Sequence, residues 1–162
     1  DVTYTEFVSC EGLLSKGRKK LLDDLIFSET ERPIVAQIFG SKLEQFSKCA
    51  ELIKKLGKLA GLSIKPKTLV ESIPDDLWEY CDVALIMSVE PGWGGQSFIS
   101  EVLDKVRYLR EKFHAKNINI DGGINEKTGR LAVDAGCNWL VAGTYIFKSK
   151  DCRKAVESLR FQ

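Results

Sequence analysis

The stretch VALIMSVEPGWGGQ, residues 83–96, joins an apolar run to a loop that is rich in glycine. The run Val83–Val89 carries no charge, which is typical of a strand covered on both faces, as in a parallel sheet. One proline and three glycines follow within positions 91–95. Apolar residues then recur at helical spacing from Ile99 to Phe113. The stretch therefore predicts a strand, a loop of exposed backbone and a helix, in that order.

The same alternation runs along the whole chain and indicates an α/β protein built of βα units with parallel strands. We expect a TIM-barrel-type fold truncated to about six βα units, forming a single domain over residues 1–162. An open parallel α/β sheet is the alternative, because a full barrel usually needs about 200 residues or more. The predicted strands are Val2–Val8, Ile34–Phe39, Leu59–Ile64, Val83–Val89, Asn117–Asp121 and Trp139–Ala142.

Several helix boundaries can also be predicted. Ser41 and Thr68 each begin a capping pattern, with Glu44 and Glu71 three residues later. Pro74 is expected to divide the second of these helices. Asn125 is the expected N-cap of a further helix that ends before Gly136. A last helix is predicted over residues 151–159.

The composition limits the classes of partner. Lys and Arg number 24 against 23 Asp and Glu, so the net charge of +1 gives no reason to expect nucleic acid or a membrane surface. No apolar stretch approaches the roughly 18 residues that a membrane span requires. The five cysteines form no CxxC pair, which indicates free thiols in a reducing compartment. We therefore expect a cytoplasmic protein.

Three of the six expected strand ends lead into glycine-rich loops, at Pro91–Gln96, Asp121–Ile124 and Ala142–Thr144. Glycine lets successive N–H groups converge on one anion, and the loops after the last barrel strands are a recurrent phosphate site. Ordinary strand-to-helix turns are the alternative. Asp121 would serve as a general acid/base or metal ligand, or would only cap the next turn. Met87 would cover a substrate or pack in the core.

Four motifs resemble the C-terminal half of ribulose-phosphate 3-epimerase, in family order and at family spacing over residues 52–161. They are AGLSIKPKT at 60–68, VALIMSVEPGWGGQSFI at 83–99, INIDGGIN at 118–125 and WLVAGTYIF at 139–147. The resemblance implies a TIM barrel that interconverts ribulose 5-phosphate and xylulose 5-phosphate. It also implies a divalent metal ion (zinc, iron, manganese or cobalt) and two aspartates that move a proton at C3.

The resemblance also implies roles for particular residues. Asp121 matches one catalytic aspartate and metal ligand, and Met87 matches a methionine over the active site. The positions that match phosphate-binding residues are Gly94, Gly95, Gly122, Gly123, Gly143 and Thr144. The implied partner is a phosphorylated pentose or a phosphate ion.

The N-terminal part departs from this pattern. The family's HxD motif, with the second aspartate, is absent, and so are most of the expected metal ligands. Tyr4–Leu13 and Pro33–Gly40 resemble instead two strands of tRNA dihydrouridine synthase, a TIM barrel that uses FMN. Gln37 matches a flavin-contacting glutamine there, but the catalytic cysteine and flavin lysine are missing, so FMN is not expected. Residues 1–50 and 52–161 thus resemble two halves of a hybrid barrel.

Three functions follow as hypotheses. The chain is an epimerase; or it is a recombined or designed barrel scaffold that keeps a phosphate site without efficient catalysis; or it is a fragment of an FMN-dependent tRNA dihydrouridine synthase. Six units leave sheet edges to be covered, so pairing with a second copy is one expected solution.

Overall fold

The structure is a computed structural model that describes residues 3–23, 26, 28–31, 34–39, 42–55, 59–93 and 95–161. The chain divides into two compact units, residues 1–58 and 59–162. Every strand pairing in both units is parallel, and strands alternate with helices, so the predicted fold class is confirmed. The strands form one two-stranded and one four-stranded sheet, and within the described ranges neither closes into a barrel. The single-domain organisation stays a prediction.

The first unit contains a parallel pair of strands with helices beside it. The register between β1 and β2 shifts between Tyr4 and Phe7. Ser9 caps α1 by accepting a hydrogen bond from the Gly12 N–H, and α1 packs against α3. Val8, Cys10, Leu13 and Cys49 form a buried cluster between these elements. The elements are β1 (Thr3–Ser9), α1 (Cys10–Leu13), α2 (Lys19–Leu22), η2 (Glu29–Glu31), β2 (Ile34–Phe39) and α3 (Leu43–Lys55).

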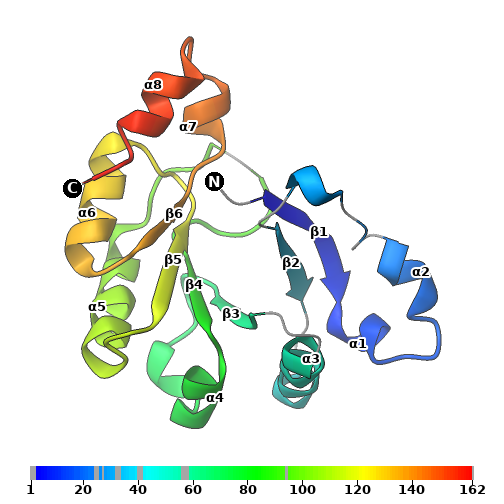
Figure 1. The fold of residues 1–162 in the computed structure, drawn as a ribbon. Coiled ribbons are helices and arrows are strands. Elements are labelled where there is room, and N and C mark those ends of the chain that lie inside the picture. The colour runs from blue at the N-terminus through cyan, green and yellow to red at the C-terminus, as the bar shows by residue number, and fades with distance from the viewer. Residues whose placement is uncertain are drawn as a thin grey trace. The chain divides into compact units, whose positions relative to one another are not determined.

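The second unit contains a four-stranded parallel sheet in the order β3-β4-β5-β6 (Figure 1). Its strands follow one another in both sequence and space, as in a segment of a TIM barrel. The largest differences from the predicted strand ends are at β3, which begins at Gly61 rather than Leu59, and at β4, which ends at Met87 rather than Val89. The strands are β3 (Gly61–Ile64), β4 (Val83–Met87), β5 (Asn117–Asp121) and β6 (Trp139–Val141).

Most helix ends of this unit lie where the sequence predicts, but the cap expected at Thr68 is wrong: η3 begins at Val70 after Leu69, and no side chain caps it. Asn125 caps α6 in a reciprocal capping box with Thr128, and Gly136 ends that helix at a φ of 114°. Pro74 separates η3 from α4, as expected of a residue without an amide hydrogen. The capping role of Ser41 lies outside the described residues. The helices are η3 (Val70–Ser72), α4 (Asp75–Tyr80), η4 (Ser100–Val102), α5 (Leu103–Lys112), α6 (Glu126–Ala135), α7 (Thr144–Phe147) and α8 (Cys152–Glu157).

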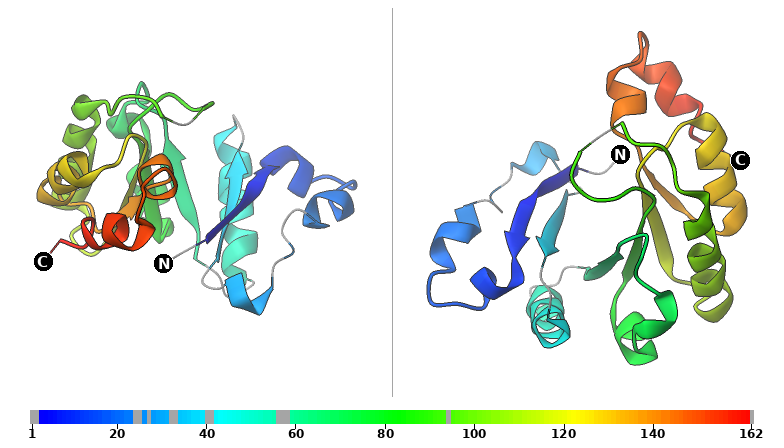
Figure 2. Two further views of the ribbon diagram at one scale, coloured as in Figure 1. Left: turned by 90° about the horizontal axis from the view of Figure 1, so that it is seen from above. Right: turned by 180° about the vertical axis from the view of Figure 1, so that it is seen from behind.

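The core of the second unit lies between the sheet and helices α5 and α6, which cover one face (Figure 2). Ala84 and Ile86 of β4, with Ile118 and Ile120 of β5, are fully buried toward this layer. Alternate residues point to the opposite face, because successive side chains of a strand alternate. Asn117, Asn119 and Asp121 therefore share that second face. The candidate site lies where this face meets the carboxyl ends of the strands.

The five cysteines are all free thiols, as predicted, and only Cys152 is exposed. Burial raises the pKa of the Cys10 and Cys137 thiols to about 12, so both stay protonated at neutral pH. Among the described helices, none combines the length and the apolar character needed to cross a membrane.

Candidate functional site

The carboxyl ends of three neighbouring strands bring the predicted site residues of the second unit together. Met87 at the end of β4 pairs in register with Asp121 at the end of β5, and Asp121 pairs with Val141 at the end of β6. Gly143 and Thr144 follow β6 directly. The parallel register therefore places Asp121 between Met87 and Val141, next to the start of the loop after β6.

Asp121 is half-buried at this edge. Burial raises the pKa of its carboxyl above the ordinary value for aspartate, because desolvation disfavours the charged form. A carboxyl shifted in this direction holds a proton closer to neutral pH, which suits a group that both takes up and returns protons. Met87, also half-buried, lies beside it on β4.

The turn after Asp121 requires its two glycines. Gly122 and Gly123 have φ values of 122° and 61°, which side chains with a Cβ rarely adopt. A Cβ on Gly122 would lie 2.5 Å from Val89 Cγ2, and one on Gly123 would lie 2.7 Å from the Phe98 nitrogen. The backbone of the loop after β4 thus lies directly against this turn.

Hydrogen bonds fix the turn from two sides. The Ser88 N–H donates to the Asp121 carbonyl at 2.7 Å, and the Ser88 hydroxyl lies 2.7 Å from the Gly122 carbonyl. From the other side, the Thr128 hydroxyl donates to the Gly123 carbonyl at 2.9 Å. The Gly123 N–H has no acceptor among the residues that the structure describes. A half-buried amide donor without a described acceptor therefore lies two residues after Asp121.

Hydrogen bonds join the two ends of the loop after β4, residues 88–99, and connect residues within it. The Ile99 N–H donates to the Ser88 carbonyl at 2.9 Å. The Gln96 side-chain amide donates to the carbonyls of Glu90 and Trp93, at 2.6 and 2.9 Å. Gly95 has a φ of 81° and open space where a Cβ would stand. Gly94, a predicted phosphate-binding position, lies outside the described residues.

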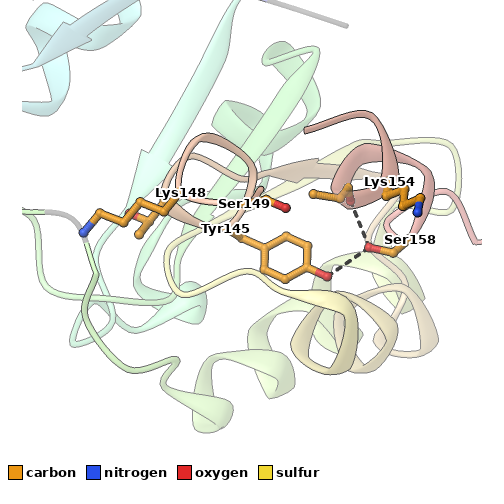
Figure 3. A pocket seen from close by; sticks show the side chains of 7 residues that line it. Tyr145, Lys148, Ser149, Lys154 and Ser158 are labelled. Carbon is orange, nitrogen blue, oxygen red and sulfur yellow. Dashed lines mark hydrogen bonds between the residues drawn. The ribbon is translucent and has the colours of Figure 1, made fainter. Parts of the chain in front are cut away.

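The loop after β6 is exposed. Gly143 precedes α7, and a Cβ at this glycine would meet no atom within 4 Å, while Thr144 is the first residue of that helix. Thr144 borders an open hollow of about 570 Å³ between α7 and α8 (Figure 3). The Tyr145 hydroxyl lies 3.0 Å from the Ser158 hydroxyl within it. Lys148 and Lys154 extend away from each other on opposite sides of the hollow in Figure 3, so their charges do not converge on one point.

Two polar residues near the site were not predicted. Ser88 is 0 % exposed and bonds to the Asp121–Gly122 backbone. Asn119, on the same face of β5 as Asp121, is 3 % exposed, and its Oδ1 has no donor among the described residues. The alternation Asn-Ile-Asn-Ile-Asp over residues 117–121 is the sequence signal that could have identified Asn119.

The described residues do not form a site for a divalent metal ion. Such ions take four or more ligands in proteins, usually several of them from side chains. Asp121 offers one carboxylate, and the described part of the chain holds no group of three His, Cys, Asp or Glu placed to share an ion. Gln37, the predicted flavin contact, lies in β2 of the other unit, where its Cα pairs with that of Phe7.

The fold and this edge define a class: a parallel α/β protein of TIM-barrel type, with an acidic residue and a glycine turn at the carboxyl ends of its strands. Residues 21–147 match the profile described as "Ribulose-phosphate 3 epimerase family". The chain belongs to the ribulose-phosphate 3-epimerase family. The match begins well before residue 52, where the resemblance to the epimerase half was expected to start, and so includes the β2 segment.

Individual relatives agree with this assignment. Over 128 residues the chain is 42% identical to "Ribulose-phosphate 3-epimerase" of Schizosaccharomyces pombe, covering 77% of this chain and 56% of the relative. Over 114 residues it is 45% identical to the protein of that name from Mycobacterium bovis, covering 68% and 49%. A rice relative, "Ribulose-phosphate 3-epimerase, cytoplasmic isoform", is 35% identical over 72% of this chain and 52% of its own length. The chain thus spans about half the length of the curated relatives it matches.

Similarity to solved structures extends to the fold. The "Crystal structure of Amycolatopsis orientalis BexX/CysO complex" aligns with 98% of this chain and 63% of that chain at a TM-score of 0.62. The sequence identity is 18%, so this similarity concerns the fold alone.

Proposed function

We propose that this chain acts on a phosphorylated pentose as a ribulose-phosphate 3-epimerase, interconverting ribulose 5-phosphate and xylulose 5-phosphate. The observation that carries the proposal is the Asp121–Gly122–Gly123 turn. It combines a carboxyl of raised pKa with an amide donor two residues later that has no described acceptor. Family membership supports the same chemistry.

Asp121 is the proposed proton carrier. Its carboxylate would take the proton from C3 of the sugar, and the electron pair of the broken C–H bond would pass toward the C2 carbonyl. Return of a proton to the opposite face of C3 would complete the epimerisation. Met87, next to Asp121 in register, would present an apolar surface to the sugar backbone.

The phosphate group would bind to main-chain donors. Gly123 offers a half-buried N–H, and the positions matching the family's other phosphate residues are Gly94, Gly95, Gly122, Gly143 and Thr144. Amides without a side chain in front of them allow a phosphate oxygen to approach closely. This arrangement favours a phosphorylated sugar over an uncharged one.

The family resemblance implies a divalent metal ion, but the described residues do not fit one. The family's second catalytic aspartate also has no match in this sequence. These two points support a second candidate function, a barrel scaffold that binds phosphate without efficient turnover. Both functions use the same edge of the sheet, so one experiment can separate them.

The experiment follows ribulose 5-phosphate by ¹H NMR in D₂O, with and without added Zn²⁺, Fe²⁺, Mn²⁺ or Co²⁺. An epimerase produces xylulose 5-phosphate. A site with Asp121 as its one proton carrier exchanges the C3 hydrogen for deuterium without changing the configuration at C3. A scaffold does neither, yet its melting temperature rises with phosphate.

Asp121→Asn is the decisive variant, because the amide cannot accept the C3 proton. The expected loss of turnover or exchange is at least about 100-fold. Asp104→Asn, at an exposed ion pair with Arg107, is the matched control and should leave both rates unchanged. Full activity of Asp121→Asn would refute the assigned role.

Further parts of the proposal rest on resemblance and composition. We propose a cytoplasmic location, in line with the name of the rice relative. We also propose that the partners are a phosphorylated pentose, phosphate and a second copy of the chain. The hybrid origin of the chain, in which residues 1–50 and 52–161 derive from two different barrels, stays a prediction. The flavin hypothesis is the weakest, and absence of flavin absorbance in purified protein would reject it.

A further inference from the structure

We propose that the hydroxyl group of Ser88 positions the Gly123 N–H for the phosphate group, so that Ser88 is a positioning residue of the site. The inference rests on the proposed function, because it assigns a ligand to that amide. Its starting observation is independent of function: Ser88 is completely buried and bonds twice to the turn that follows Asp121.

The two bonds of Ser88 serve different carbonyls. The Asp121 carbonyl already receives the Ser88 N–H at 2.7 Å. The hydroxyl has one proton to donate, and it lies 2.9 Å from the Asp121 carbonyl and 2.7 Å from the Gly122 carbonyl. Because the Ser88 N–H already donates to the Asp121 carbonyl, the hydroxyl proton is available to the Gly122 carbonyl. Within the described residues the hydroxyl is the one donor to the Gly122 carbonyl.

Fixing the Gly122 carbonyl also fixes the direction of the next amide. A trans peptide is planar, so its N–H points opposite to its C=O. The carbonyl of the Gly122–Gly123 peptide points toward Ser88, at the end of β4. The Gly123 N–H therefore points away from Ser88, and β6 pairs with β5 on the edge opposite β4. The residues proposed to bind phosphate after β6, Gly143 and Thr144, follow on that side.

The hydroxyl is needed because the peptide joins two glycines. Both Gly122 and Gly123 have positive φ. Glycine can change between backbone conformations that other residues rarely adopt, so this peptide can rotate more easily than most. Without a donor, the Gly122 carbonyl would be left unpaired near the buried Ser88 position, and rotation of the peptide would relieve it. Such a rotation would turn the Gly123 N–H away from the phosphate position while leaving the Asp121 backbone bond intact.

The test uses the full ¹⁵N,¹³C-labelled chain as wild type and as Ser88→Ala, Ser88→Thr and Ser72→Ala. Threonine keeps the hydroxyl. Ser72 is the matched control, because its hydroxyl donates to a carbonyl, that of Leu69, at an exposed position away from the turn. NMR first records the Gly122 carbonyl carbon and Gly123 amide resonances without ligand, and inorganic phosphate is then titrated.

In Ser88→Ala, both resonances should move and the phosphate dissociation constant should rise about tenfold. Ser88→Thr and Ser72→Ala should behave as wild type. Unchanged resonances and unchanged phosphate affinity in Ser88→Ala would overturn the positioning role. If the wild type itself fails to bind millimolar phosphate, the phosphate site fails, whereas the free-state resonances still decide whether Ser88 orients the peptide. Should Ser88→Ala not fold, Ser88→Cys, of similar size and with a weaker donor, takes its place.

Discussion

The carboxyl group of Asp121 illustrates how a proposed catalytic residue can cost stability. It is half-buried, and burial raises its pKa. A raised pKa in the folded state means that the folded protein binds the proton more tightly than the unfolded chain does. The contribution of this group to stability is therefore complete below the ordinary aspartate pKa, and it is lost as the pH rises through the raised value.

We accordingly predict that Asp121→Asn stabilises the protein at neutral pH. The neutral amide avoids burial of a charge, so the melting temperature of the variant should exceed that of the wild type near pH 7. The difference should shrink as the pH falls toward about 3, where both side chains are uncharged. Melting curves of both proteins from about pH 3 to pH 8 measure this. A difference that does not depend on pH would contradict the role of desolvation.

At the scale of elements, Lys105 of α5 joins its helix to the loop after β3. Its ammonium group donates to the carbonyls of Lys65, Pro66 and Thr68. Three donors thus meet three acceptors within one loop. Burial lowers the pKa of Lys105, and the nearby Glu71 opposes that shift. The exposed ion pair between Lys67 and Glu90 adds a contact between the loops after β3 and β4.

Lys105→Met should destabilise the protein by about 1–3 kcal/mol, because the loop carbonyls lose their donors while the aliphatic stem is retained. Urea denaturation measures the decrease in the free energy of unfolding. Faster hydrogen exchange at the Thr68 amide, which donates to the Lys65 carbonyl, would show that the loop after β3 is the part destabilised. Arg107→Met on the same helix is the control, since its exposed pair with Asp104 should contribute no more than about 0.5 kcal/mol. An equal loss in both variants would argue against the loop contact.

At the scale of the whole molecule, the two units differ in how many neighbouring strands each strand pairs with. β4 and β5 are each paired on both sides, and their helix-facing residues are fully buried. β1 has β2 as its one described neighbour. A sheet of two strands buries few of its hydrogen bonds, so its local opening needs less free energy.

Native-state hydrogen exchange should therefore be slowest at the amides of β4 and β5 and faster at those of β1 and β2. NMR-detected exchange on the intact chain reports each strand separately. β6 is an internal control, because it belongs to the larger sheet but pairs there on one side, and it should be intermediate. Protection of β1 equal to that of β5 would contradict the prediction.

Local patterns in the sequence accounted for much of the fold and for part of the site. Apolar runs located all six strands, and Asn125 and Gly136 marked the ends of α6 because caps act on neighbouring residues. The four-residue helices α1, α2 and α7 carry too few turns for a periodic signal and were not located. Ser88 was missed because its partner is 34 residues away, and no local rule connects the two.

By itself, the sequence determined that this chain is a parallel α/β protein, and its motifs pointed to the epimerase family. It also predicted Asp121 and the glycine turn as a candidate site, because strand ends and glycines are local features. Only the tertiary structure decided that Met87 lies beside Asp121, that Ser88 holds the Gly122 carbonyl, and that Lys105 holds the loop after β3. Each of these depends on register or packing between distant segments, which burial and hydrogen bonding fix only once the sheet has formed.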